Sequence, residues 1–313
     1  MRLDFLAALS GVMIAMQARV NGELSHRLDN GLQAALVSFG SGLLIIALIT
    51  PFSAQIKDGI TNLRGAIARK EIARWKMFAG ALGGSFVAIQ TQIVPLIGVA
   101  IYSVASIAGQ TAMSLVVDRI GLTGGGKKLI SVRRLLAAIL TVFAVLVSVW
   151  DRIDANDLSM VAVSAAGIAG AIVGVQRALN GQINEYSHQS FTTSLLNFIM
   201  GTSFLLILII AGIFIGKNDL SPLPTDTWWI YTGGVIGVIY IAFTSTIVQH
   251  LGVLTFTLFS VGGQLVGSLI IDLVSPTDGV SVSAYLVTGI AMTYAGVIAG
   301  GVSSSRVKKP QKL

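Results

Sequence analysis

The chain has 313 residues, of which 54% are hydrophobic and 11% are charged, and its mean hydropathy is +0.81. This composition excludes an ordinary soluble globular protein, and the lack of cysteine excludes disulfide bonds and thiolate metal sites. The formal net charge of +7 could indicate nucleic-acid binding, but the basic residues gather between apolar runs, so we expect no nucleic-acid partner.

Apolar runs long enough to cross about 30 Å of hydrocarbon follow one another along the chain. In chain order they predict ten spans, at residues 5–20, 34–52, 77–99, 101–117, 135–150, 158–179, 191–215, 228–248, 251–271 and 282–302. They lack the two-residue alternation of barrel strands, so we expect an all-α integral membrane protein. A secretory signal peptide is the alternative for the first run, but its positive region is Arg2 alone and no clean cleavage site follows.

Basic residues predict how the chain crosses the membrane. If the N-terminus is cytoplasmic, most lysines and arginines fall in cytoplasmic loops and in a short basic tail. The positive-inside rule therefore predicts a multi-pass protein of the bacterial cytoplasmic (inner) membrane with both termini in the cytoplasm. In the second loop Ile56, Ile60, Leu63 and Ile67 recur at helical spacing, which predicts an amphipathic helix lying on the inner surface.

Two pairs of segments indicate a duplication. "MQARVNGEL" at residues 16–24 matches "VQRALNGQI" at 175–183, and "SIAGQTAMSLVVD" at 106–118 matches "SVGGQLVGSLIID" at 260–272 without a gap. We therefore expect two domains, residues 1–150 and residues 151–313, each a five-helix repeat, with the basic cytoplasmic tail at the end of the second. Because five is odd, the second repeat must be inverted relative to the first.

An inverted repeat is typical of carriers, because exchanging the conformations of its halves changes the side to which the protein opens. We therefore expect a secondary transporter that moves a small metabolite or drug-like solute by alternating access. It would not be an enzyme and would need no cofactor. The alternative is a non-transporting membrane scaffold or partner subunit. A coupling ion and a homodimer are left open, and a passive channel fits less well because no ring of charges is visible.

The pattern Gln17-x3-Asn21-Gly22, followed by "AALVSFGSG" and later by Gly109-Gln110 with Asp118, resembles the YdcZ-like family of the drug/metabolite transporter superfamily. The resemblance implies a fused two-repeat form with ten helices, an EamA-like fold and a central cavity between the halves. It departs from the small multidrug branch because the first span has no glutamate near its middle.

Candidate binding residues form polar stripes on spans four and nine. Residues at spacings of four wind slowly around a helix and share one face. The stripes contain Ser106, Gln110, Ser114 and Asp118 in the first half and Ser260, Gln264, Ser268 and Asp272 in the second, with Ser103 and Thr257 extending them. Two interpretations stay open for Gln110 and Gln264: hydrogen bonds between helices, or contacts to a solute from opposite sides of the pseudo-axis.

Further amides are candidates for substrate binding. Gln17 and Asn21 share a helix face, as do Gln176 and Asn180, at the ends of the first spans of the two halves. In span three Gln90 and Gln92 are polar, and we align them with Phe243 and Ser245, which predicts a cavity with one amide-rich wall and one aromatic wall. Pro95 should kink or end that helix.

Charged residues near the span ends have structural alternatives. Asp118 and Asp272 could be gates, ion contacts or interfacial side chains, and Arg119 could pair with Asp118. Arg177 either snorkels to the interface, which we favour, or meets an anionic group. The GxxxG pairs Gly80/Gly84 and Gly233/Gly237, which we align with each other, should permit close helix packing. The three histidines are scattered, so no metal site is expected.

Overall fold

The computed structural model describes residues 2–122, 129–152, 160–216, 219–251, 253–277 and 281–301, and the regular structure in these ranges is helical. The elements are α1 (Arg2–Leu28), α2 (Gly31–Ile49), η1 (Thr50–Phe52), α3 (Ala54–Ala68), η2 (Arg74–Phe78), α4 (Ala79–Ile120), α5 (Val132–Ser148), η3 (Trp150–Arg152), α6 (Met160–Ser187), α7 (Ser190–Phe214), η4 (Trp228–Tyr231), α8 (Gly233–Leu251), α9 (Val253–Val274) and α10 (Ala284–Gly301). The side chain of Thr257, the linker at 153–159 and the basic tail after residue 301 lie outside the described parts.

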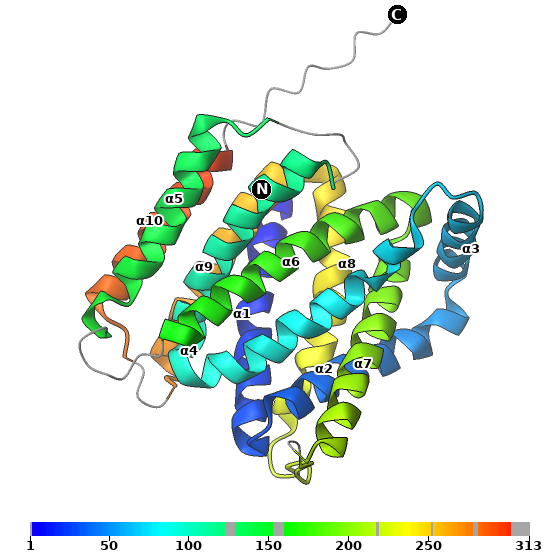
Figure 1. The fold of residues 1–313 in the computed structure, drawn as a ribbon, viewed down its shortest axis with the longest axis horizontal. Helices are drawn as coiled ribbons and strands as arrows, with labels where there is room; N and C mark the ends of the chain where they lie inside the picture. The colour runs from blue at the N-terminus through cyan, green and yellow to red at the C-terminus, as the bar shows by residue number, and fades with distance from the viewer. Residues whose placement is uncertain are drawn as a thin grey trace, which may run out of the picture.

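Each of the ten predicted spans is helical within the described ranges. Spans three and four form one 42-residue element, α4, with a break at Gly98, where the chain reverses direction (Figure 1). Gly98 has φ 79° and ψ 167°, a conformation open essentially to glycine alone. Pro95, which we expected to kink or end the helix, lies one turn before this break, and the glycine makes the bend.

The outward faces of the helices are apolar. Five described helical segments are long and apolar enough to cross a membrane: Leu3–Leu28, Gly31–Phe52, Arg74–Ile120, Met160–Ser187 and Ser190–Phe214. Large exposed side chains such as Leu44, Leu48, Ile139, Phe143 and Ile207 cover the outer surfaces of α2, α5 and α7. Such surfaces suit a lipid environment, because lipid chains are as apolar as leucine.

Two helix pairs make equivalent contacts in the two halves of the structure. A methyl group on Gly11 of α1 would collide with the carbonyl oxygen of Ser260 in α9, and one on Gly170 of α6 would collide with that of Ser106 in α4. Gly263 against Ala8 and Gly109 against Gly167 repeat this relation. The helices in each pair therefore touch backbone to backbone, and the second pair reproduces the first with the halves exchanged, as an inverted repeat requires. The division at residue 150 stays a prediction.

The two halves also meet through α2 and α7. Gly42 of α2 packs on the ring of Phe198 in α7, and Gly201 of α7 packs on the ring of Phe39 in α2. The centroids of the two rings are 5.3 Å apart. These reciprocal contacts lie where the pseudo-two-fold axis must pass, because each is converted into the other by exchanging the halves.

Glycine contacts correct our alignment of spans three and eight by one residue. Gly80 meets the carbonyl oxygen of Asn197, and the matching contact to the carbonyl oxygen of Ser38 is made by Gly234, not by Gly233. Likewise Gly83 and Gly237 meet Gln176 and Gln17, respectively. The predicted match of Gly80/Gly84 with Gly233/Gly237 is therefore wrong, because one residue turns a helix face by about 100°.

The same shift changes the partners of the two glutamines in span three. Gln90 corresponds to Thr244 rather than Phe243, and Gln92 corresponds to Thr246 rather than Ser245. The predicted contrast between an amide-rich wall and an aromatic wall loses its basis.

The remaining helices lie at the edges of the molecule (Figure 1). Helices α5 and α10 pack side by side, with Gly289 against Ser148 and Gly296 against Thr141. Helix α3 is amphipathic as predicted. Its apolar face, with Ile56 and Leu63 buried, packs on α6 and α7 rather than on lipid. Helix α3 lies at one end of the molecule, which we call the α3 end. The opposite end contains η4, and we call it the η4 end.

The close helix contacts yield a stability prediction. Replacing Gly11 or Gly170 by alanine should destabilise the fold by about 1–3 kcal/mol, because the added methyl group forces two backbones apart. Gly40→Ala is the matched control: a methyl group there meets nothing within 4 Å, and alanine favours a helix over glycine. Thermal unfolding of the purified variants in detergent measures the effect. Equal melting temperatures for all three variants would contradict the proposed packing.

Candidate functional site

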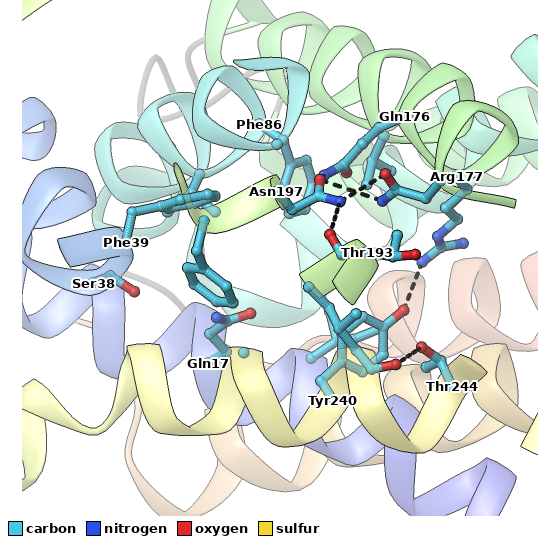
Figure 2. Close-up of a pocket in the computed structure, with 18 of the residues that line it drawn as sticks. Gln17, Ser38, Phe39, Phe86, Gln176, Arg177, Thr193, Asn197, Tyr240 and Thr244 are labelled. Atoms are coloured by element: carbon cyan, nitrogen blue, oxygen red, sulfur yellow. Dashed lines mark hydrogen bonds between the residues drawn. The ribbon is translucent and has the colours of Figure 1, made fainter. Parts of the chain in front are cut away.

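A cavity of about 430 Å³ lies between the halves, where α1, α2, α4, α6, α7 and α8 converge (Figure 2). Much of its lining consists of residues related by the duplication. These pairs are Ile14 with Val173, Gln17 with Gln176, Ser38 with Asn197, Phe39 with Phe198, Gly83 with Gly237, Phe86 with Tyr240, and Val87 with Ile241. The cavity therefore lies on the pseudo-axis. Its volume is within the range of small-molecule sites.

One part of the lining is aromatic. Phe39, Phe86, Phe198 and Tyr240 contribute rings from four different helices. Their rings offer an apolar surface that can surround an apolar group of a solute. The sequence offers no signal that separates these aromatic residues from ordinary core or lipid-facing ones.

Amides form a connected network on another wall. Gln176 Nε2 donates to Asn197 Oδ1 at 2.9 Å, and Asn197 Nδ2 donates to Asn180 Oδ1 at 2.7 Å and to the carbonyl oxygen of Thr193 at 2.9 Å (Figure 2). Across the cavity Gln17 Nε2 donates to the carbonyl oxygen of Gly233 at 2.9 Å. Asn197 is the centre of this network, and its alignment with Ser38 in the second span is the sequence signal that could identify it.

Gln110 lies at the cavity beside a cation. Its Oε1 accepts from Arg177 Nη1 at 2.6 Å, and its Nε2 donates to Ser106 Oγ at 3.2 Å. A second bond joins Arg177 Nη2 to the hydroxyl of Tyr240 at 3.3 Å (Figure 2). Arg177, for which we favoured snorkelling, thus lines the cavity, and its side chain ties α6 to α4 and α8.

Four predicted binding residues do not reach the cavity. Gln264 is 3% exposed and packs where α9 crosses Gly11 of α1, so it does not face Gln110 across a shared space. Asn21 is buried beside Gly233, and neither polar atom of its side chain has a hydrogen-bond partner in the described structure. Gln90 is fully buried within α4, and Gln92 lies on the exposed side beside Gly31. Gln17, Gln110, Gln176 and Asn180 are the predicted residues that the cavity brings together.

The two candidate gate aspartates have different partners. Asp272 is 2% exposed, and its carboxylate accepts the backbone N–H groups of Val99 at 3.2 Å and Ala100 at 2.8 Å. It thereby caps the helix that starts after the Gly98 break, where unpaired N–H groups and the helix dipole favour an anion. Asp118 forms an ion pair with Arg134 at 2.7 Å. Its predicted pairing with Arg119 is not formed, because adjacent residues on a helix do not face each other.

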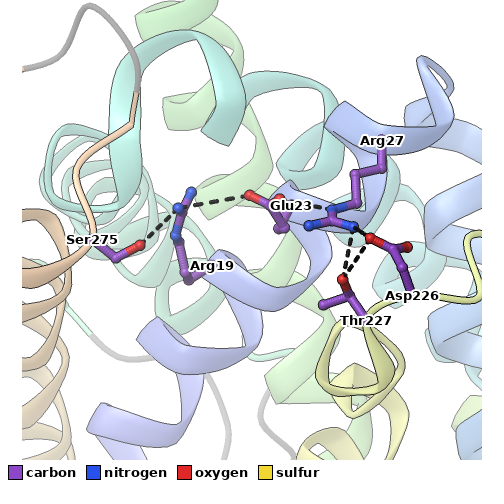
Figure 3. Close-up of polar contacts among 6 residues, drawn as sticks. All are labelled: Arg19, Glu23, Arg27, Asp226, Thr227 and Ser275. Carbon is purple, nitrogen blue, oxygen red and sulfur yellow. Dashed lines mark hydrogen bonds and ion pairs between the residues drawn. The ribbon is translucent and has the colours of Figure 1, made fainter.

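Polar contacts also hold the η4 end together (Figure 3). Arg27 of α1 binds Asp226 at 2.7 Å and Thr227 at 2.8 Å, and its hydrogen bond holds the pKa of the Asp226 carboxyl below its ordinary value. Arg19 pairs with Glu23, four residues further along α1, and also donates to Ser275 Oγ at 2.9 Å. These bonds join α1 to the segments that precede η4 and α10.

Repeat-related positions show that the two ends differ. At the η4 end Ala18, Asn21 and Ser25 are buried, and Gly22 packs on Val94. Their counterparts are Arg177, Asn180, Gly181 and Asn184, all of which line the cavity. A methyl group on Gly181 would have no described atom within 4 Å. Along the described residues the cavity therefore extends toward the α3 end, while the corresponding region at the η4 end is packed.

Among the described residues no group of three histidine, aspartate or glutamate side chains is placed so that it could hold a metal ion. A search of curated proteins finds no match to this chain. One similar solved structure, described as "Crystal structure of protein", is 11% identical, covers 98% of each chain and has a TM-score of 0.54, which is a likeness of fold alone.

A family model assigns the chain more specifically. The model DMT_YdcZ, described as "Putative inner membrane exporter, YdcZ", matches residues 3–147 and again residues 161–299. The two matches fall on the two halves that the glycine contacts relate. The chain belongs to the YdcZ family of the drug/metabolite transporter superfamily.

Proposed function

We propose that the protein is a secondary carrier that exports a small solute by alternating access, with the central cavity as its binding site. The observation that carries this proposal is that one cavity, lined by repeat-related residues, extends toward one end while the other end is packed. Exchanging the conformations of the halves would close the α3 end and open the η4 end. A scaffold or partner subunit would have no need of this arrangement.

A cavity-filling substitution tests transport. Gly181→Trp should abolish saturable solute flux in proteoliposomes yet leave the melting temperature close to that of the parent protein, because the new side chain enters the cavity and not the packed core. Gly40→Trp is the control, since a side chain begun there also meets nothing within 4 Å but does not enter the cavity. A broad metabolite panel supplies the solutes. Flux that is equal in both variants would contradict the site. An absence of saturable flux for every solute in the panel would favour a scaffold.

We further propose that the α3 end faces the cytoplasm. The basic residues of α3 and of the segment before α4 lie at this end, as the positive-inside rule requires. The cavity would then be open to the cytoplasm, which is the side from which an exporter loads its solute.

Cysteine labelling tests this orientation in a chain that has no cysteine of its own. Asp219→Cys, at the η4 end, should react with an impermeant thiol reagent added outside intact cells. Asn62→Cys and Glu185→Cys, at the α3 end, should react only after the membrane is opened. All three parent side chains are solvent-exposed. Ser187 would be a poor probe, because it is 1% exposed. Labelling of Glu185→Cys from outside would reverse the proposed topology.

The aspartates suggest how the ends could alternate. Asp272 caps the helix start at Val99, and the repeat relates Asp118 to Asp272 and the start of α9 at Val253 to Val99. In the other state Asp118 would leave Arg134 and cap α9, while Asp272 would release α4. Each end would then be closed by the same device, a carboxylate on a helix N-terminus.

Removing one cap should shift the population of states. Loss of a helix cap costs about 0.5–2 kcal/mol, so Asp272→Ala should raise the fraction open at the η4 end by roughly 2- to 30-fold. A single cysteine at Ala18, which is 1% exposed in the packed end, reports this opening as faster labelling from outside. Asp272→Asn keeps an acceptor for the cap and should label more slowly than Asp272→Ala. An unchanged labelling rate in folded Asp272→Ala protein would refute the gate.

A further inference from the structure

Arg177 is the one charged side chain among the described residues that line the cavity. The remaining lining residues are amides, hydroxyls, aromatic rings, aliphatic side chains and glycines. The site therefore has a formal charge of +1, which favours a solute of opposite sign.

Neutral groups hold the guanidinium of Arg177 in the described structure. Its bonds go to the Gln110 amide oxygen at 2.6 Å and the Tyr240 hydroxyl at 3.3 Å, and none of the described ion pairs includes it. These bonds use two of the five N–H donors of an arginine. The planar fork of N–H groups matches the two oxygens of a carboxylate.

The duplication does not by itself require an arginine at this position. Its counterpart in the other half is Ala18, which packs in the η4 end without any charge. Ionisable side chains in transmembrane helices are rare and usually mark a functional site, and Arg177 is exposed at the open cavity. The asymmetry between Arg177 and Ala18 therefore points to a role outside packing.

The geometry points to an anionic solute with an apolar body: we propose that the cavity binds a small aromatic or branched monocarboxylate, with Arg177 as the contact for the carboxylate. Phe39, Phe86 and Phe198 provide the apolar surface, and Tyr240 links that surface to the guanidinium. Asn180 and Asn184 line the same space and can bind a polar substituent. This inference rests on the proposed carrier function and names the chemical class of its solute.

Binding of matched probe pairs tests the charge requirement. Benzoate, phenylacetate and 4-methylpentanoate, each compared with its uncharged amide, are titrated into the purified protein in a zwitterionic detergent. The carboxylates should bind saturably, and each amide should bind about ten- to a hundredfold more weakly, the scale of lost charge-assisted hydrogen bonds. Equal affinity for carboxylates and amides would overturn the proposal but would not contradict the carrier function.

Substitutions identify the residue. Arg177→Gln should lose carboxylate binding, Arg177→Lys should keep part of it, and Arg177→Glu should shift the preference from phenylacetate to phenethylamine. Arg119→Gln is the control, because it removes the same charge from an exposed position outside the cavity. Unchanged carboxylate affinity in folded Arg177→Gln protein would overturn the proposal.

The anionic group could instead belong to a lipid. Counterflow of radiolabelled benzoate is therefore measured in vesicles of phosphatidylcholine alone and of phosphatidylcholine with phosphatidylglycerol. The proposal requires counterflow in both and its loss in Arg177→Gln. An effect of Arg177→Gln that appears only with phosphatidylglycerol, without carboxylate binding, would assign the arginine to a headgroup and overturn the proposal. No saturable flux of any solute, charged or neutral, would instead refute the carrier function on which it rests.

Discussion

Direct contact between helix backbones is the constraint on which this architecture depends. Lipid supplies no hydrophobic force between apolar helices, so the helices must gain from close packing. Glycines at crossings of α1 with α9 and of α6 with α4 let each helix rest on a carbonyl oxygen of its neighbour. Because both crossings use equivalent residues, the same crossing geometry occurs in both helix pairs. The cavity is the space that remains when α2 and α7 meet through Phe39 and Phe198 between these pairs.

Symmetry in the packing makes the asymmetry of the site informative. A given residue and its counterpart have the same neighbours in a perfectly symmetric arrangement, as Gly83 and Gly237 nearly do. Gly22 and Gly181 do not: the first packs on Val94 and the second lines the cavity. Both ends can use the same local sequence because the difference lies in how the helices are positioned. Two arrangements of one sequence motif within a single chain are what a bistable carrier requires.

Much of the fold could be predicted from the sequence, because hydropathy, the odd number of spans in each half and an ungapped internal match all depend on many residues. The one-residue error between spans three and eight arose where only sparse glycines supported the match, and contacts such as Gly80 with Asn197 were needed to remove it.

The site was harder to predict. Repetition suggested that Gln110 and Gln264 are equivalent, yet of the two only Gln110 lines the cavity, because the two halves adopt different arrangements around it. Asp272 likewise looked interfacial from its place at a helix end. It caps a helix 172 residues earlier in the chain, a distance that no local pattern can encode.

The charge of Arg177 bears on how the protein could avoid changing conformation without a bound solute. In the packed η4 end the counterpart Ala18 is buried, so the same packing at the α3 end would bury Arg177. A guanidinium that leaves water with only neutral partners is strongly disfavoured, whereas one paired with a carboxylate loses far less. The loaded protein could then close over its solute more readily than the empty one. In such a carrier, the residue that selects the solute by charge would also make closure depend on the solute being present.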